Sequence, residues 1–178
     1  MIGPHVTLKM KGLRGLQKSL QVSSSGPIRD AYRVWARQYR SFAQQRFSKY
    51  SRGGGDWPDL AESTKKGRRG PRKGHTGARQ FGILYNIGLL FGTLQPVFAS
   101  VPGQHQSDLK NGVRVGFGGL GRYPDGKATI ADIAAFHQEG SGRLPKREII
   151  VEPDEATLAQ MKAVLAQATQ TEIGRHKP

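Results

Sequence analysis

The stretch that decides the fold runs from residue 133 to residue 147 and reads Ile-Ala-Ala-Phe-His-Gln-Glu-Gly-Ser-Gly-Arg-Leu-Pro-Lys-Arg. Its apolar start predicts a short turn of helix that ends near Gly140, and a glycine loop follows. Pro145 then leads into Arg147–Val151, a run with β-branched residues that predicts an edge strand. The stretch also contains a histidine and a glutamate, so the rest of the chain must decide whether it is catalytic or structural.

An amphipathic helix precedes this stretch in the N-terminal third of the chain. Pro27 suits a first helical position, and the apolar residues after it recur mostly at steps of three and four. This spacing predicts one helix of about 23 residues whose apolar face is buried as core. The residues of that face are Ile28, Tyr32, Trp35, Tyr39, Phe42, Phe47 and Tyr50.

Shorter segments complete the predicted layout. Alternating or β-branched patterns predict strands over residues 6–11, 95–101 and 112–117. The last two are expected to pair as an antiparallel hairpin across the polar connection 103–111. Apolar spacing predicts a helix over residues 83–90, which Gly88 ends or bends, and a second helix over residues 129–136 with Thr129 as its N-cap. A last helix is predicted after Pro153. Its expected buried stripe is Leu158, Met161, Val164 and Leu165. The predicted class is α+β: a small antiparallel sheet packed by one long N-terminal helix and shorter helices, with long basic and glycine-rich loops.

Length and composition predict one domain, residues 1–178, with two poorly packed segments. Residues 51–80 are poor in apolar side chains apart from Trp57–Leu60, which predicts a long mobile loop, and residues 171–178 are expected to form a flexible tail. The chain contains no cysteine, which excludes disulfides and thiol catalysis. No apolar run reaches the roughly 20 residues of a membrane helix, so membrane contact is not expected.

Positive charge is concentrated in the N-terminal part of the chain. Residues 1–80 contain 18 basic and 4 acidic side chains, whereas residues 81–178 contain 10 and 9. Such a distribution favours polyanions or acidic protein surfaces as partners. Seven cations without a neighbouring acid form the candidate contact site for DNA or an acidic partner, and the alternative is a solvated loop. They are Lys65, Lys66, Arg68, Arg69, Arg72, Lys73 and Arg79.

No enzyme, metal or cofactor motif is complete in the sequence. The five histidines lack the H-x-x-x-H or H-x-H spacing of a metal site. The glycine motif Gly116–Gly121 is followed by turn residues, whereas a dinucleotide site needs a helix there. His137, with Glu139 or Asp132, is the best candidate for a general base, but no nucleophile motif accompanies it. We therefore expect no catalytic residue and no cofactor, and interpret His137 as a packed or interface residue at a helix end.

Five segments match a single pattern when they are read in order along the chain. They are Trp57-Pro58-Asp59-Leu60 with Thr64-Lys65, Ile83–Leu90, Val113–Gly116, Ile133–Gly140 and Leu144–Glu148. Their order and spacing resemble the virion morphogenesis proteins of Mu-like tailed phages, which are related to neck, tail-completion and tail-terminator proteins. Each motif is weak alone, and the resemblance spans about residues 27–168.

The resemblance implies a non-enzymatic structural protein of the phage head–tail junction, made in the host cytoplasm and incorporated into the virion. Such a protein is expected to form a homo-oligomeric ring around the DNA path. Its expected partners are the connector or adaptor, the tail terminator, the tail tube or sheath and, without sequence specificity, genomic DNA. The expected assembly residues are Trp57, Phe136, His137, Gln138 and Arg147. Two other functions remain open: a sequence-independent DNA-binding protein and, less favoured, a small nuclease or toxin that uses His137.

Overall fold

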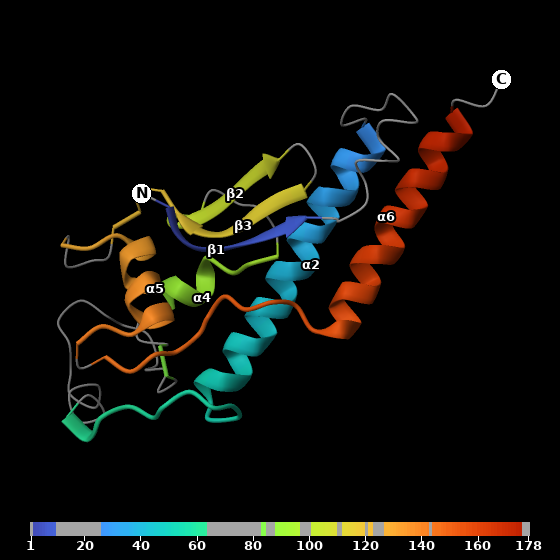
Figure 1. The fold of residues 1–178 in the computed structure, drawn as a ribbon. Coiled ribbons are helices and arrows are strands. Elements are labelled where there is room, and N and C mark those ends of the chain that lie inside the picture. Colours follow the sequence, from blue (N-terminus) through green and yellow to red (C-terminus); the bar gives the residue numbers. More distant parts are fainter. Residues whose placement is uncertain are drawn as a thin grey trace.

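The computed structural model describes residues 2–9, 26–63, 83–84, 88–96, 101–109, 112–119, 121–122, 127–142 and 144–175. Within these residues the chain forms a three-stranded antiparallel sheet, a long helix that crosses it, a second long helix beside the first, and two shorter helices (Figure 1). The predicted α+β class is therefore confirmed. The predicted contact site between Lys65 and Arg79 lies outside the described residues.

The sheet has β3 (Gly112–Gly118) at its centre, between β1 (Ile2–Lys9) and β2 (Gln104–Leu109). Both pairings are antiparallel. Alternate side chains of β3 point to the same face, and those on the inner face belong to the hydrophobic core. These buried residues are Val113, Val115 and Phe117.

The structure corrects the predicted hairpin. Its second strand agrees with β3, but the first strand is β2, which lies in the predicted connection rather than at residues 95–101. Residues 95, 96 and 101 are outside any strand, and residues 97–100 lie outside the described part of the chain. Because β2 is an edge strand with polar residues on both faces, its sequence lacks the alternation that marks a half-buried strand.

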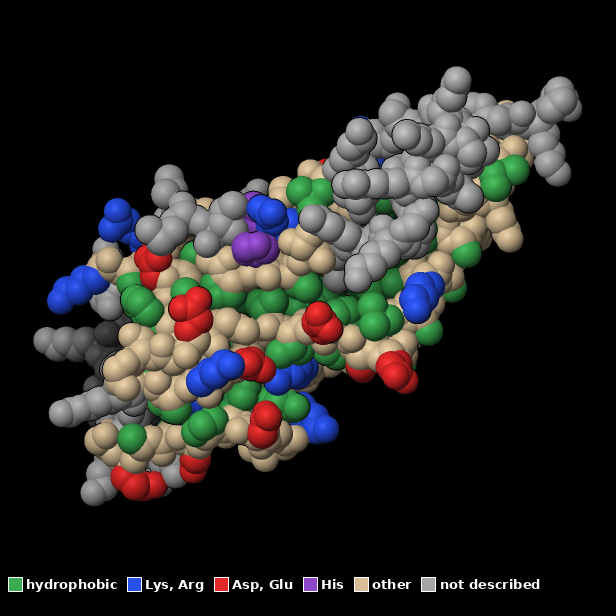
Figure 2. Space-filling model, viewed as in Figure 1, with side chains coloured by type: hydrophobic (Ala, Val, Ile, Leu, Met, Phe, Trp, Pro, Cys, Tyr) green, Lys and Arg blue, Asp and Glu red, His purple; other side chains and the backbone are tan. Residues whose placement is uncertain are grey.

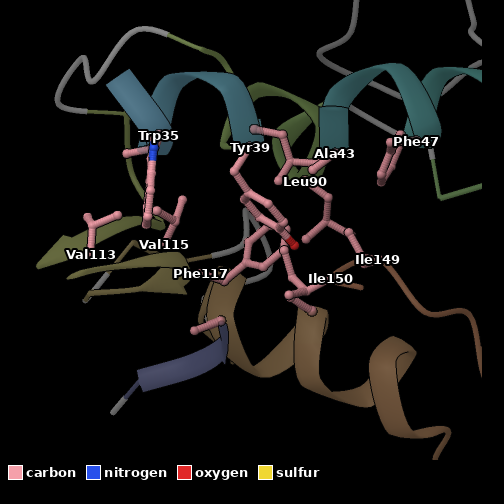
Figure 3. Packing of buried hydrophobic residues seen from close by; sticks show 14 of the residues in the cluster. Trp35, Tyr39, Ala43, Phe47, Leu90, Val113, Val115, Phe117, Ile149 and Ile150 are labelled. Carbon is pink, nitrogen blue, oxygen red and sulfur yellow. The ribbon is translucent and has the colours of Figure 1, made fainter. Parts of the chain in front are cut away.

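The long helix α2 (Gly26–Ser51) confirms the predicted amphipathic helix. Its apolar face lies across the inner face of the sheet, where Trp35 and Tyr39 meet the buried residues of β3 (Figure 3). Trp35, Tyr39 and Phe47 are buried, and Phe42 packs against the same cluster. The aromatic series is therefore core, as predicted.

The second long helix, α6 (Glu155–Arg175), lies alongside α2 and runs in the opposite direction (Figure 1). Trp35 Nε1 donates a hydrogen bond to the carbonyl oxygen of Met161 over 2.6 Å. Met161 and Leu165 are buried against α2. At the start of the helix, the N–H of Thr157 donates to the Asp154 carboxylate over 2.8 Å, which satisfies a backbone donor of the first turn.

One prediction for this last helix is wrong: Leu158, expected in the buried stripe, is 38% exposed. The helix continues through Arg175, past Thr171, and Glu172 is buried. The flexibility of the tail from residue 171 stays a prediction.

The helix α5 (Ile130–Glu139) begins with the predicted N-cap and extends beyond the predicted end. Thr129 Oγ1 accepts a hydrogen bond from the N–H of Asp132 over 3.1 Å, and the Asp132 carboxylate accepts one from the N–H of Thr129 over 2.9 Å. This capping box satisfies two donors of the helix start. Hydrogen bonds from the Thr129 side chain and backbone hold the pKa of Asp132 below its usual range.

The helix predicted over residues 83–90 is replaced by a turn and a shorter helix. Ile83 and Leu84 lie in a turn, and α4 covers Leu89–Gly92. Gly88 has φ +77°, a left-handed conformation that favours glycine. The glycine therefore precedes the helix, whereas the sequence pattern places it at the end.

Residues 51–60 follow α2 as a turn and a packed segment. Within it, Trp57 is 6% exposed. Burial of Trp57 agrees with the expectation that Trp57–Leu60 is the packed part of this stretch, whereas residues 52–56 are exposed. The mobility of the loop predicted over residues 51–80 stays a prediction, and residues 64–80 lie outside the described residues.

Candidate functional site

The predicted assembly residues surround one extended segment, residues 145–151. The sequence predicts an edge strand there, but the segment is not part of the sheet. Its backbone groups are bound instead by side chains from α2, α5 and the segment after α2. We call Trp57, Gln138 and Arg147 together with residues 145–151 the clasp.

Gln138, in the last turn of α5, forms hydrogen bonds with the backbone of the extended segment. Its side-chain oxygen accepts hydrogen bonds from the N–H groups of Ile149 and Ile150, each over 2.9 Å. Its side-chain nitrogen donates to the carbonyl oxygen of Ile150 over 2.8 Å. One amide thus replaces the backbone pairing that a neighbouring strand would supply, and it holds both isoleucines in the core (Figure 3).

Arg147 joins the clasp to the chain after α2. Its guanidinium donates to the carbonyl oxygen of Pro58 over 3.0 Å and 2.8 Å, and to that of Asp59 over 3.1 Å. Its backbone N–H donates to the carbonyl oxygen of His137 over 2.6 Å. The side chain is only 4% exposed, and hydrogen bonds from a charged donor contribute about 1.5–3 kcal/mol each. Arg147 therefore acts inside the domain.

Trp57 contacts the extended segment from the side of α2. Its Nε1 donates to the carbonyl oxygen of Glu148 over 3.2 Å, and Arg46 donates to the same oxygen. The Trp57 ring makes edge contacts with Phe47 and Tyr50, with ring centroids 5.3 Å and 5.6 Å apart. Arg46 also stacks over Tyr50, 4.1 Å from the ring centroid, a cation–π contact.

Tyr39 holds the end of the extended segment. Its hydroxyl donates to the carbonyl oxygen of Val151 over 2.9 Å. Burial raises the pKa of Tyr39 well above its ordinary value, so the hydroxyl keeps its proton and donates across the accessible pH range. The segment is thus anchored by Gln138 and Arg147 near its middle and by Tyr39 at its end.

Exposed side chains flank the clasp. Phe136 on α5 is 43% exposed and Leu144, before the segment, is 45% exposed. Lys146 forms an exposed ion pair with Glu148 over 2.6 Å, and this partner holds the pKa of Glu148 below its usual range. Of the predicted assembly residues, Phe136 is the one that presents a large apolar surface. His137 is half-buried and contributes its carbonyl to the clasp.

An open hollow of about 650 Å³ lies beside the clasp at the C-terminal end of α2. Arg52 and Asp59 give it opposite charges, and Trp57 gives it an apolar wall. This mixture indicates no specific reaction. Its described lining residues are Ser51, Arg52, Gly53, Gly55, Trp57, Asp59 and Ile83.

A second group of charged residues lies on α2, where the sequence reasoning treated them only as the polar face of a helix. Arg29, Arg33 and Arg37 recur every four residues and are exposed. We call these three the arginine row. Arg33 also forms an exposed ion pair with Asp30 over 3.4 Å. The i, i+4, i+8 spacing was the available signal, because it places three cations along one side of a helix.

Metal-binding groups and membrane-spanning helices are absent from the described residues. No group of three or more His, Asp or Glu side chains among them could hold a metal ion. None of the described helices is both long and apolar enough to span a membrane. Comparison of the chain with protein-family models, curated proteins and solved structures finds no match.

Proposed function

We propose that this chain is a structural protein of the tailed-phage head–tail junction, acting as a neck, tail-completion or tail-terminator subunit and assembling as a ring around the DNA path. One observation carries the proposal. Motif segments that suggested the resemblance, although far apart in the sequence, bind one another in the clasp. Trp57 donates a hydrogen bond to the carbonyl oxygen of Glu148, and Arg147 donates hydrogen bonds to the carbonyl oxygen of Pro58.

These hydrogen bonds connect sequence segments that carry the resemblance. Unrelated short motifs that matched by chance would have no reason to share hydrogen bonds across about 90 positions of sequence, as Trp57 and Glu148 do. The resemblance therefore concerns a connected framework, which supports the family proposal and the structural role that goes with it.

The exposed apolar side chains beside the clasp are the proposed contact with neighbouring subunits. Phe136 and Leu144 each leave more than two fifths of their surface uncovered, next to a segment that Gln138, Arg46, Trp57 and Tyr39 hold by its backbone. Aromatic and aliphatic anchors on a rigid support are typical of the centres of protein interfaces. We assign the contact to these two residues rather than to Arg147, which is buried.

Deletion of the gene from the phage genome tests the function directly. Electron microscopy of the lysate should show filled heads and separate tails, and infectivity should return when the wild-type gene is supplied. A deletion strain that yields joined, infectious particles would contradict the proposal. Cryo-EM of the intact particle should then place the chain in a ring at the junction.

Phe136→Ser supplied to the deletion strain tests the contact. We expect at least a tenfold loss of joined particles, because the interface loses its aromatic anchor. Leu158→Ser is the matched control, since Leu158 is 38% exposed on α6, away from the clasp. Both purified variants should unfold at the wild-type denaturant concentration, and equal joining by the two variants would remove Phe136 from the interface.

A sequence-independent nucleic-acid-binding protein is the second candidate function. The observation that favours it is the charge of α2, which carries six basic residues and one acidic residue between Gly26 and Ser51. By contrast, α6 carries two of each between Glu155 and Arg175. If the deletion strain forms normal particles while the purified protein binds duplex strongly, this candidate replaces the junction role.

A further inference from the structure

The face of the sheet that points away from α2 carries a group of basic side chains. Because side chains alternate along a strand, the buried residues of β3 leave Arg114 and Gly116 on this outer face. In the strand register Gly116 lies opposite both His5 and His105. We call His5, His105 and Arg114 the sheet cluster. Figure 2 shows histidine and Lys/Arg side chains side by side over these strands.

Glycines hold the two histidine-bearing strands close together. A Cβ atom at Gly116 would lie 2.3 Å from the carbonyl oxygen of Pro4 and 2.5 Å from the Cα of His5. A Cβ atom at Gly118 would lie 2.9 Å from the Cβ of His105. No larger residue fits at either position without movement of these neighbours. The backbone of β1 and the side chain of His105 therefore lie directly against these buried glycines, which brings His5 and His105 close to the centre of the outer face.

Arg114 is the permanent cation of the sheet cluster, because a lowered pKa favours the neutral form of His105. Burial lowers the pKa of His105, and the charges of His5, Arg114 and Arg40 lower it further. Neither His5 nor Arg114 forms an ion pair with an acidic residue in the part of the chain that the structure describes. Asp108, the acidic residue of β2, lies an odd number of positions from His105, so its side chain points to the other face.

A second set of positive charges lies on α2, on the other side of the sheet. Nη2 of Arg40 lies 3.5 Å from the carbonyl oxygen of His105, which brings the helix to the edge strand, but Arg40 is only 1% exposed. With 3.6 residues per turn, the exposed arginine row covers a sector of about 80° over about 12 Å of helix axis. Arg29 lies in the first turns of α2, where the helix dipole disfavours a cation. Stability therefore does not explain its position.

We propose that the arginine row on α2 and the sheet cluster on the opposite face of the sheet each contact the phosphodiester backbone of duplex nucleic acid. Arginine guanidiniums donate paired hydrogen bonds to phosphate oxygens, and a duplex offers one phosphate charge per about 1.7 Å of axis. The arginine row, about 12 Å long, can therefore meet several phosphates. The contacts reach phosphates and no bases, so the binding is independent of sequence.

This inference goes beyond the proposed junction role, because it concerns the purified chain. The two can fail separately: duplex binding needs no particle, and particle joining through Phe136 needs no duplex binding. The cations between Lys65 and Arg79 are the same in every variant below. Differences between variants therefore report the sheet cluster and the arginine row.

Salt-dependent binding of a 20-base-pair duplex to the full chain tests the proposal. Arg114→Gln should weaken binding several-fold and reduce the slope of log affinity against log salt by about 1, as expected for the loss of one phosphate contact. Arg33→Gln with Arg37→Gln should reduce the slope by about 2. Lys162→Gln on α6 removes the same charge from an exposed site and should leave the slope unchanged. Unchanged slopes for both test variants would overturn the proposal.

The pKa of His105 supplies a second measurement, which reports on the sheet cluster itself and not on the total charge of the protein. A phosphate beside Arg114 offsets the positive charge that lowers the His105 pKa, so NMR titration should show this pKa rising when duplex is added. Polyglutamate of equal charge should bind more weakly and leave the His105 pKa unchanged. If polyglutamate matches the duplex in both measurements, the surface recognises acidic protein instead and the proposal is wrong. A His105 pKa that duplex does not change would equally exclude the sheet cluster.

Discussion

The clasp and the sheet cluster use similar residue types in opposite ways. In the clasp, the guanidinium of Arg147 and the amide of Gln138 bind carbonyl and N–H groups of the same chain. In the sheet cluster, His5 and Arg114 have no ion pair with a described acidic residue, and Nε of Arg114 has no hydrogen-bond partner among the described residues.

This difference separates structural from functional polar residues. A buried polar group that is fully bonded within the chain contributes to stability and specifies one arrangement of the core. Burial, and then the nearby charges of His5, Arg114 and Arg40, lower the pKa of His105, so an anion from outside would stabilise these basic groups. The clasp should therefore respond to substitution through stability, and the sheet cluster through binding.

Arg147→Ala is expected to have the largest effect and tests the structural half of the comparison. It removes three hydrogen bonds from a charged donor to the carbonyl oxygens of Pro58 and Asp59, and it leaves the space of a side chain that is 4% exposed. We expect the free energy of unfolding to fall by about 3 kcal/mol. Urea denaturation followed by the fluorescence of Trp35 and Trp57 measures it.

Lys146→Ala is the neighbouring control for this substitution. Its ion pair with Glu148 is well exposed on both sides, so its loss should change stability by about 0–1 kcal/mol. If the free energy of unfolding falls equally in both variants, Arg147 contributes only as a surface charge and does not hold the clasp together.

Gln138→Leu should have a smaller but clear effect. Leucine fills a similar volume but leaves two N–H groups and one carbonyl of Ile149 and Ile150 without a partner. The expected loss is about 2 kcal/mol. Gln160→Leu makes the same change at an exposed position of α6 and should have little effect. If the two variants have equal denaturation midpoints, the extended segment does not depend on the amide.

His105→Gln should have the smallest effect, visible only in the pH dependence of stability. The folded protein lowers the pKa of His105, so the unfolded chain binds its proton more readily. Stability is therefore retained above the unfolded pKa of about 6.5 and is lost as pH falls through the range below it. The variant should lose less stability than the wild type between pH 7 and pH 5. An identical loss in both proteins would place His105 in an ordinary environment.

Elements set by local chemistry could be predicted from the sequence. The spacing of aromatic residues from Tyr32 to Phe47 predicts α2, and Thr129 with Asp132 marks the start of α5. The sheet was harder, because β2 is polar on both faces and carries no periodic signal. The strand expected at Arg147–Val151 was wrong for the opposite reason: its β-branched sequence is typical of a strand, but side chains occupy its backbone groups.

The candidate sites also divide into features that the local sequence predicts and features that depend on tertiary contacts. The motif residues of the clasp could be found in the sequence, but their buried structural role could not, because their partners are far away in the chain. The sheet cluster had no sequence signal, since His5, His105 and Arg114 come together only through strand register. The arginine row had a signal in its four-residue spacing, yet its neighbour on β2 was unknown.

The sequence by itself determined the α+β class, the long amphipathic helix and the excess of positive charge, because these depend on composition and on patterns within a few turns. Only the tertiary structure decided that Arg147 binds Pro58 and that Gln138 replaces a neighbouring strand. The physical reason is that a buried backbone group must find a hydrogen-bond partner, and any side chain that the fold brings near can supply it. For residues 145–151 those partners come from α2, α5 and the segment after α2.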